Sequence, residues 1–202
     1  MKIGPKYKIA KRLGPSVFEK TQTQKFALSQ ERKAKAKGRP RNASEYGKQL
    51  LEKQKVRITY GLSEKQFGNY VAKAMEEHGA NPAEILHRYL ELRLDSVIYR
   101  LGLAKTRRAA RQMVSHGHIT VNGKKTTIPS QYIKIGDRIA IRGGSKASVM
   151  FEGFAERFME RPLASWLSWN PKDMEGGISD LPSVASADPA GDLGAVLSFY
   201  SR

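Results

Sequence analysis

The feature that most constrains the fold is a change in hydrophobic period between residues 93 and 142. The first part carries apolar residues at the three- and four-residue spacing of a helix: Leu94, Val97, Ile98 and Leu101. A second helix is expected between Thr106, a residue type that caps helices, and Gly117, a residue type that ends them. Beyond Gly117 the period falls to two, as in half-buried strands. We therefore expect two helices followed by a small sheet.

The strand-like part contains a strong hairpin signal. Ile119 and Val121 alternate with polar residues, and Asn122-Gly123 follows, a pair typical of two-residue β-hairpin turns. A second alternating run turns at Gly136-Asp137 and carries Ile133, Ile135, Ile139 and Ile141. Together these patterns predict a compact α+β module over residues 93–155, in which two helices pack on a small, mostly antiparallel sheet.

The flanking segments predict further helices. Ser44 can cap one helix, Ser63 and Gln66 form a capping-box pattern for a second, and Asn81-Pro82 opens a third. We assign residues 44–92 together with residues 156–202 to one mainly helical body, into which the module is inserted.

The C-terminal stretch is less regular. Phe154, Phe158 and Met159 predict one more helix, and Trp166 and Trp169 are expected to anchor the segment that follows. Residues 176–194 are rich in turn-forming residues and are predicted to form a long surface loop. The closing residues 195–202 are apolar enough for a terminal strand or a short helix.

Residues 1–43 predict an extended basic N-terminal arm. Its like charges are interrupted by glycine and proline, so the segment has little apolar surface to bury. One alternative is a disordered tail, and the other is an arm that orders when it lies on phosphate groups. The aromatic residues Tyr7, Phe18 and Phe26 favour the second alternative.

The charge of the chain narrows the class of partner. It has 36 basic and 19 acidic side chains, a formal charge of +17 and a pI near 10.1. The basic excess lies in residues 1–143, which favours a polyanionic partner. The chain has no cysteine, so disulfides and thiolate metal ligands are excluded. It has neither a signal-peptide pattern nor an apolar run of the roughly 20 residues that span a bilayer, so we expect a soluble cytoplasmic protein without a membrane partner.

The stretch from Thr106 to Gly123 could be a metal or catalytic site, a solvated basic helix or a surface for RNA. Arg111 lies four positions after Arg107 and three after Arg108, so the three are expected to form one positive ridge, which Lys124 and Lys125 extend. The opposite face should pack on the core through Ala109, Ala110, Met113 and Val114. Guanidinium groups suit bidentate contact with phosphate, and residues 96–136 contain no acid, which favours RNA over a solvated face.

A metal site is not expected here. His116 and His118 are close in sequence, but a zinc site needs three or four ligands. The other two histidines, His78 and His87, lie far along the chain, and no carboxylate is near this segment.

Residues 93–142 resemble the RNA-binding module named after the fourth protein of the small ribosomal subunit. Because that module occurs in several RNA-handling proteins, the remaining segments decide the family. Four of them resemble, in order, the bacterial ribosomal protein four family: residues 4–14, 44–71, 162–178 and 199–202. The resemblance covers nearly the whole chain.

The resemblance implies a structural, non-enzymatic constituent of the small ribosomal subunit. It implies a primary binder of 16S ribosomal RNA that nucleates assembly, lies near the messenger RNA entrance and contributes to decoding accuracy with small-subunit protein five. In the helical block it implies RNA contacts at Lys53, Gln54, Lys55, Arg57, Tyr60, Gln66 and Phe67. In the module it implies RNA contacts at Arg93, Arg100, Thr106, Arg107, Arg111, His116, Asn122 and Lys124, to which the ridge adds Arg108 and Lys125.

The chain departs from the family pattern in two places. Many members carry a four-cysteine zinc knuckle in the arm, but residues 21–38 have neither cysteine nor histidine, so no metal or other cofactor is expected. We expect lysines and arginines to order the arm on RNA instead. The terminal motif has Ser198 where an acidic residue is usual, and the loop before it lacks the usual arginine.

Two other functions use the same module. RNA-modifying pseudouridine synthases carry a catalytic aspartate in an Arg-Leu-Asp motif, which Arg93, Leu94 and Asp95 reproduce. Asp95, however, falls on the polar side of a helix inside the module, where an ion pair with arginine is expected, and no separate catalytic domain is present. A binder of stalled ribosomal subunits would not need the helical block or the arm.

Overall fold

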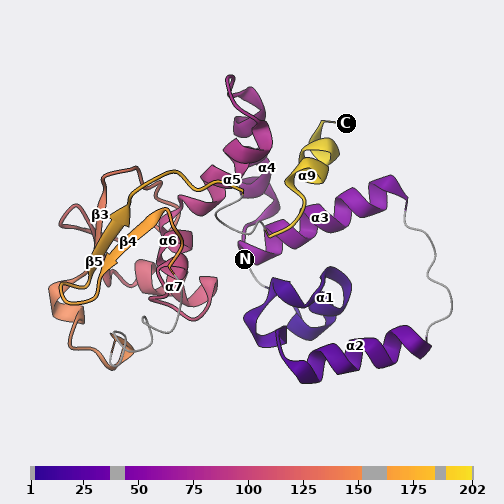
Figure 1. The fold of residues 1–202 in the computed structure, drawn as a ribbon, viewed down its shortest axis with the longest axis horizontal. Coiled ribbons are helices and arrows are strands. Elements are labelled where there is room, and N and C mark those ends of the chain that lie inside the picture. Colours follow the sequence, from indigo (N-terminus) through magenta and orange to yellow (C-terminus); the bar gives the residue numbers. More distant parts are fainter. Residues whose placement is uncertain (1–2, 37–43, 152–162, 185–189, 202) are drawn as a thin grey trace. The chain divides into compact units, whose positions relative to one another are not determined.

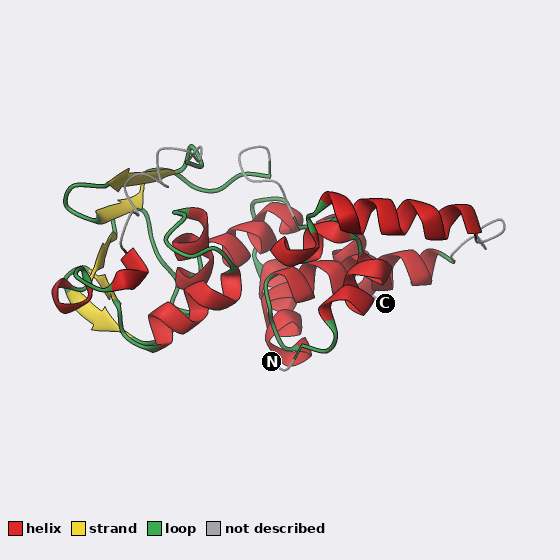
Figure 2. Ribbon diagram, turned by 90° about the horizontal axis from the view of Figure 1, so that it is seen from below, coloured by secondary structure: helices red, strands yellow, loops and turns green. Residues whose placement is uncertain are grey.

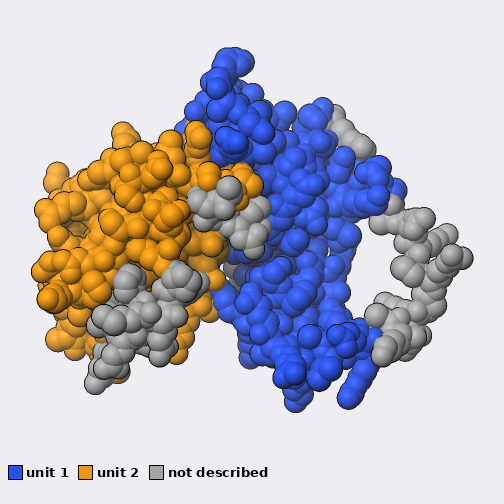
Figure 3. Space-filling view, in the orientation of Figure 1, with its two compact units in different colours: residues 1–86, 189–202 blue, residues 87–188 orange. Residues whose placement is uncertain are grey.

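The computed structural model describes residues 3–36, 44–151, 163–184 and 190–201. The chain divides into two compact units, shown in blue and orange in Figure 3. Unit 1 comprises residues 1–86 and 189–202, and unit 2 comprises residues 87–188. Each unit is described by itself.

Unit 1 is helical (Figure 1). Its helices are α1 (Lys6–Leu13), α2 (Gln24–Ala36), α3 (Glu45–Thr59), α4 (Glu64–Glu76) and α9 (Leu193–Tyr200). The expected capping signals are confirmed. Ser44 accepts a hydrogen bond from the Gly47 amide at 3.2 Å, and Ser63 forms the capping box with Gln66. Helix α5 (Pro82–Glu91) begins in unit 1, after Asn81 as predicted, and ends in unit 2.

The prediction of an extended N-terminal arm is wrong for residues 6–36, which fold into α1, two short 3₁₀ turns and α2. They bury a small core of their own, made of Ala10, Leu13, Val17, Phe18 and Phe26. Leu51 and Ile58 of α3 pack against this core. The few apolar residues of the segment thus contact one another and α3. The prediction missed these contacts because it relied on the excess of basic charge. Residues 37–43 lie outside the described residues.

Unit 2 contains the predicted module. Helices α6 (Leu94–Arg100) and α7 (Arg107–Ser115) accompany a five-stranded sheet whose strands are yellow in Figure 2. The strands are β1 (Ile119–Val121), β2 (Lys124–Thr126), β3 (Arg138–Ile141), β4 (Leu167–Asn170) and β5 (Glu175–Ile178). Their order is β2-β1-β3-β5-β4, and every neighbouring pair is antiparallel. The mixed, mainly helical fold class is confirmed.

The predicted hairpin is also confirmed. Val121 pairs with Lys124, and the two turn residues Asn122 and Gly123 have φ angles of 51° and 77°. Both values are those of a type I′ turn, whose twist matches that of the strands. Two details differ from the prediction: Ala109 is exposed rather than in the core, and Ile135 is 53% exposed.

The sheet extends further along the chain than the sequence indicated. Strand β5 pairs with both β3 and β4, so residues 163–184 join the module's sheet instead of the helical body. The start of the predicted surface loop is therefore strand. Gly176 lies so close to β4 that a Cβ atom there would overlap the Ser168 carbonyl. Trp166 is buried at 1% exposure, as an anchoring residue should be. The helix predicted around Phe154, Phe158 and Met159 lies outside the described residues.

Candidate nucleic-acid interface

Two carboxylates lie inside the basic module. Glu91, the last residue of α5, is fully buried, and Asp95, in the first turn of α6, is 1% exposed. Burial of an unpaired carboxylate costs on the order of several kcal/mol, so each must be compensated. Four arginines supply that compensation, two on each carboxylate.

Glu91 binds the first pair of arginines. Arg100 Nε and Nη2 donate to its two oxygens at 2.8 and 2.7 Å, a bidentate contact. Arg107 Nη2 donates to the same carboxylate at 3.2 Å, and Arg107 Nη1 donates to Ser96 Oγ at 3.0 Å. The Arg107 guanidinium also lies 4.7 Å from the centre of the Tyr99 ring. Arg107 is therefore held on three sides.

Asp95 binds the second pair of arginines. Arg93 Nε and Nη2 donate to its two oxygens at 3.0 and 2.8 Å, and Arg111 Nε donates at 2.9 Å. The expectation that Asp95 pairs with a nearby arginine is confirmed. Both oxygens of this buried carboxylate therefore accept hydrogen bonds from arginine side chains.

Because of these contacts, the three arginines of the predicted ridge differ in exposure. The side chains of Arg107 and Arg111 are 11% and 30% exposed and turn toward the carboxylates. Arg108, between them, is exposed and forms no ion pair with the described residues. Arg93 is 3% exposed, and its guanidinium is committed to Asp95. Arg108 is thus the arginine of the ridge best placed for a partner, whereas Arg93 serves the interior of the unit.

The hairpin lies beside the C-terminal end of α7. Lys125 runs over Gly117, whose φ of +72° ends the helix, and a Cβ atom there would overlap the Lys125 side chain. Lys124 and Lys125 are exposed, as is His116 at the end of α7. The structure therefore places Lys125 of β2 against the end of α7.

Other predicted residues of the module shape its local backbone. Thr106 Oγ1 accepts from the Ala109 amide at 3.1 Å and caps α7. Asn122 Nδ2 donates to Asp137 at 2.8 Å, and Asn122 Oδ1 accepts from the Arg138 amide at 2.9 Å. The sequence interpretation did not single out six exposed cations among the described residues of unit 2, although two of them lie in the same acid-poor stretch. They are Lys105, Lys134, Arg138, Arg142, Lys146 and Lys172.

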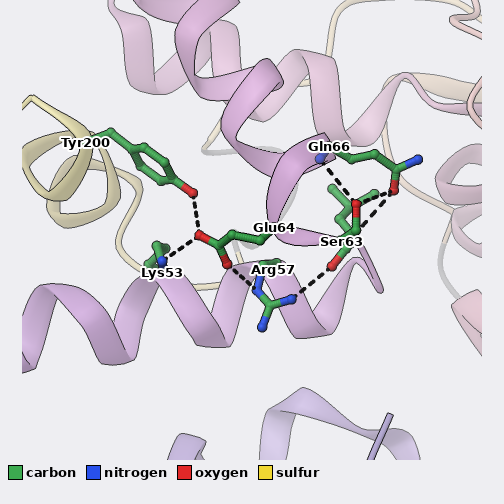
Figure 4. Close-up of polar contacts among 7 residues, drawn as sticks. Lys53, Arg57, Ser63, Glu64, Gln66 and Tyr200 are labelled. Carbon is green, nitrogen blue, oxygen red and sulfur yellow. Dashed lines mark hydrogen bonds and ion pairs between the residues drawn. The ribbon is translucent and has the colours of Figure 1, made fainter. Parts of the chain in front are cut away.

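In unit 1 two predicted RNA-contacting cations converge on one carboxylate (Figure 4). Lys53 Nζ lies 2.6 Å and Arg57 Nε 3.1 Å from the oxygens of Glu64, and Tyr200 Oη donates to Glu64 at 2.9 Å. Lys53 Nζ also lies 4.4 Å from the centre of the Phe199 ring. This cluster joins α3, α4 and α9, and nothing in the sequence pattern indicated the roles of Glu64 and Tyr200.

The remaining predicted residues of unit 1 differ in exposure. Tyr60 is 2% exposed and Phe67 fully buried, so both belong to the core. Gln66 is exposed at the start of α4, where it completes the capping box. Gln54 and Lys55 are half-buried on α3, and Lys55 lies 3.6 Å from Glu52. The structure does not bring these residues into one exposed patch.

Among the described residues, three side chains have displaced pKa values. Burial would raise the pKa of Glu64, but hydrogen bonds from Lys53 and Tyr200 and the charges of Lys53 and Arg57 lower it below its usual value. Burial and the hydrogen bond to Glu64 raise the pKa of Tyr200. Burial lowers the pKa of His87, and the charges of Arg100 and Arg107 lower it further against the opposing effect of Glu91.

Within the described ranges, no group of three or more histidine, aspartate and glutamate side chains could hold a metal ion. None of the described helices is long and apolar enough to cross a membrane.

Two protein-family models match the chain in succession. The model described as the ribosomal protein S4/S9 N-terminal domain matches residues 1–91, and the model described as the S4 domain matches residues 92–139. The second match covers α6, α7, the hairpin and the start of β3. Fold and matches together define the class: an S4 domain joined to a ribosomal-protein N-terminal domain.

Individual relatives match over nearly the whole length. The small ribosomal subunit protein uS4 of Roseiflexus castenholzii is 42% identical over 99% of this chain and 98% of its own. The proteins of the same name from Roseiflexus sp. strain RS-1 and Latilactobacillus sakei are each 40% identical over 98% of both chains. This chain therefore belongs to the small ribosomal subunit protein uS4 family, as the resemblance indicated, and that family is one of ribosomal proteins rather than enzymes.

Proposed function

We propose that the chain is a structural component of the small ribosomal subunit and that unit 2 is its main surface for 16S ribosomal RNA. The observation that carries this proposal is a set of cationic side chains on and beside α7 and β2, all exposed except Arg111, which is 30% exposed. They lie on a module in which Arg93, Arg100, Arg107 and Arg111 pair with Glu91 and Asp95. We call this set the α7–β2 surface: Lys105, Arg108, Arg111, His116, Lys124 and Lys125.

The chemistry of these side chains suits folded RNA. Lysine and arginine neutralise phosphate groups and release bound counterions, which supplies most of the affinity for a nucleic acid. Arg111, fixed by Asp95 and still 30% exposed, adds a guanidinium of defined direction. A rigid helix and a tight hairpin present these charges in a fixed pattern, which favours RNA of one shape over RNA in general.

Family membership supports a finer proposal. The chain binds 16S ribosomal RNA early and nucleates assembly, lies near the messenger RNA entrance, and acts with small-subunit protein five in decoding accuracy. The predicted RNA contacts of unit 1 belong to this proposal, with Lys53 and Arg57 acting from the cluster around Glu64. The alternative, a pseudouridine synthase, is disfavoured because its expected catalytic residue, Asp95, is 1% exposed and bound by two arginines.

Chemical footprinting on 16S ribosomal RNA tests the proposal. The full chain should protect a limited set of nucleotides from modification. Removal of residues 1–43, which contain α1 and α2, should release one subset and leave the nucleotides protected by unit 2. A chain that protects no defined nucleotides at physiological salt would contradict the proposed function.

A further inference from the structure

The buried carboxylates Glu91 and Asp95 carry negative charge in a chain whose proposed partner is also negative. In a chain of net charge +17 whose proposed partner is a polyanion, each buried carboxylate reduces the attraction for that partner. Each is also expensive to bury. Apolar side chains of similar volume could fill the same space, so packing alone does not account for the two carboxylates.

The two carboxylates bind helix α7 through its arginines. Helix α7 contributes one arginine to each of them: Arg107 reaches Glu91 and Arg111 reaches Asp95, both across sixteen positions of the chain. These two arginines lie one helical turn apart, so α7 is fixed at two successive points along its length. Each carboxylate also holds a second arginine by a bidentate contact, Arg100 on Glu91 and Arg93 on Asp95.

The fixed helix is the one that forms the α7–β2 surface. Arg108 lies between the two anchored arginines, and Lys105 precedes the helix by two positions. Anchoring removes the freedom of α7 to rotate or shift, and therefore the cost of ordering it when RNA binds. The direction in which Arg108 and Arg111 meet phosphate groups is then set before binding.

We propose that Glu91 and Asp95 are positioning residues for RNA binding: two buried negative charges that strengthen recognition of a polyanion by holding α7 and its arginines in place. This inference rests on the proposed function and identifies residues that act on its binding surface without touching RNA.

The proposal predicts that removing either carboxylate weakens RNA binding, whereas the change in net charge alone would strengthen it. Glu91→Gln and Asp95→Asn each remove one negative charge, which by charge alone should tighten RNA binding. We expect each variant instead to bind 16S ribosomal RNA about tenfold more weakly, because two or more side chains must be ordered at the moment of binding. Binding to an unrelated RNA of equal length should be unchanged or tighter, so the ratio of the two affinities should fall.

Glu175→Gln is the matched control. Glu175 also pairs with an arginine of unit 2, Arg138, but that arginine is 72% exposed and neither residue belongs to the α7–β2 surface. The substitution makes the same change in charge and breaks an arginine–carboxylate pair at the surface. It should leave the affinity ratio unchanged.

A second pair of variants covers the case in which the carboxylate variants unfold. Arg107→Lys and Arg111→Lys keep every charge but lose the planar guanidinium that grips the carboxylate. Both should lower the affinity ratio severalfold, whereas the control Arg138→Lys should not. Circular dichroism and thermal melting establish that each protein compared is folded.

The outcomes separate the two proposals. If the unsubstituted chain does not prefer 16S ribosomal RNA, the proposed function fails and this inference fails with it. If the unsubstituted chain does prefer that RNA and the folded variants of Glu91, Asp95, Arg107 and Arg111 keep the preference, only the positioning role is overturned. A lowered ratio in the folded Glu91, Asp95 or Arg107 variants, with the Glu175 and Arg138 controls unchanged, supports it.

Discussion

Arg111 on α7 and Asp95 on α6 are joined by two contacts to one carboxylate oxygen, from Nε at 2.9 Å and from Nη2 at 2.7 Å. Asp95 is buried while the Arg111 side chain is 30% exposed, so the pair connects the interior of unit 2 to its surface. Arg93, the other partner of Asp95, is buried as well. Arg93 therefore serves the interior of unit 2, whereas Arg111 also reaches its surface, and substitutions should affect stability and RNA binding differently.

Arg93→Met should destabilise unit 2 without removing a surface charge. It leaves the buried Asp95 with Arg111 alone, and loss of one partner from a buried ion pair costs about 3 kcal/mol. Both tryptophans of the chain, Trp166 and Trp169, lie in unit 2, so urea unfolding followed by tryptophan fluorescence reports this unit directly. A change in the free energy of unfolding below about 0.5 kcal/mol, the usual range for surface substitutions, would contradict the structural role of Arg93.

The combined variant Arg108→Ala, Lys124→Ala and Lys125→Ala should behave in the opposite way. All three side chains are exposed, so the free energy of unfolding should change little. The affinity for 16S ribosomal RNA should fall, and the dependence of its logarithm on the logarithm of salt concentration should lessen by about three ions. Filter binding at several salt concentrations measures both. The control Lys172→Ala removes an exposed charge of unit 2 outside the α7–β2 surface, and a triple variant no weaker than this control would refute the placement of the surface.

Glu64→Gln should loosen the C-terminal helix. Glu64 accepts from Tyr200 on α9 and pairs with Lys53 and Arg57 on α3, and the substitution weakens all three contacts. Hydrogen exchange at the α9 amides should become faster, while α1 should be unaffected. The control Glu45→Gln breaks an exposed pair with Lys48 and should leave α9 unchanged.

Because of the same carboxylate, we expect the stability of unit 1 to fall at acidic pH. The pKa of Glu64 is lower in the folded chain than its ordinary value of 4.5, so its contribution to stability is complete above pH 4.5 and is lost as the pH falls below that value. Glu64→Gln should flatten this part of the curve when thermal unfolding is followed by circular dichroism between pH 3 and 6. An identical loss of stability at low pH in the unsubstituted chain and in the variant would show that Glu64 is not responsible.

His87 predicts a second pH dependence, in unit 2. The pKa of this fully buried histidine is lowered from 6.5 by burial and by Arg100 and Arg107, against Glu91, so the unfolded chain binds the proton more readily. Stability should be complete above about pH 6.5 and should fall as the pH drops below it. His87→Leu removes the titrating group and should reduce this slope in urea unfolding followed by tryptophan fluorescence. An unchanged slope would assign the effect to another group.

What the sequence predicted well is encoded locally. Ser44, Ser63 and Thr106 cap their helices through amides only three positions away, and Asn122-Gly123 turns the hairpin by its own backbone preference. Such features depend on neighbours in the chain, so their residue types suffice to recognise them. The family likewise followed from ordered segments along the chain.

What the sequence did not predict depends on distant contacts. The N-terminal helices are stabilised by a small apolar core shared with Leu51 and Ile58 of α3, which a count of charges cannot reveal. Strand β5 is recognised only through its pairing with β3 and β4. The arginines on α7 had the expected spacing, but the buried acids that turn two of them inward are each sixteen positions away.

The most direct test of the account is a comparison of two RNAs. The unsubstituted chain is titrated with 16S ribosomal RNA and with a large-subunit ribosomal RNA fragment of equal length, at rising salt concentration. We predict at least about a tenfold preference for the small-subunit RNA near 0.15 M salt, with affinities that fall linearly on logarithmic axes as salt rises. Equal affinity for the two RNAs at every salt concentration would contradict the assignment of this chain as a specific binder of small-subunit RNA.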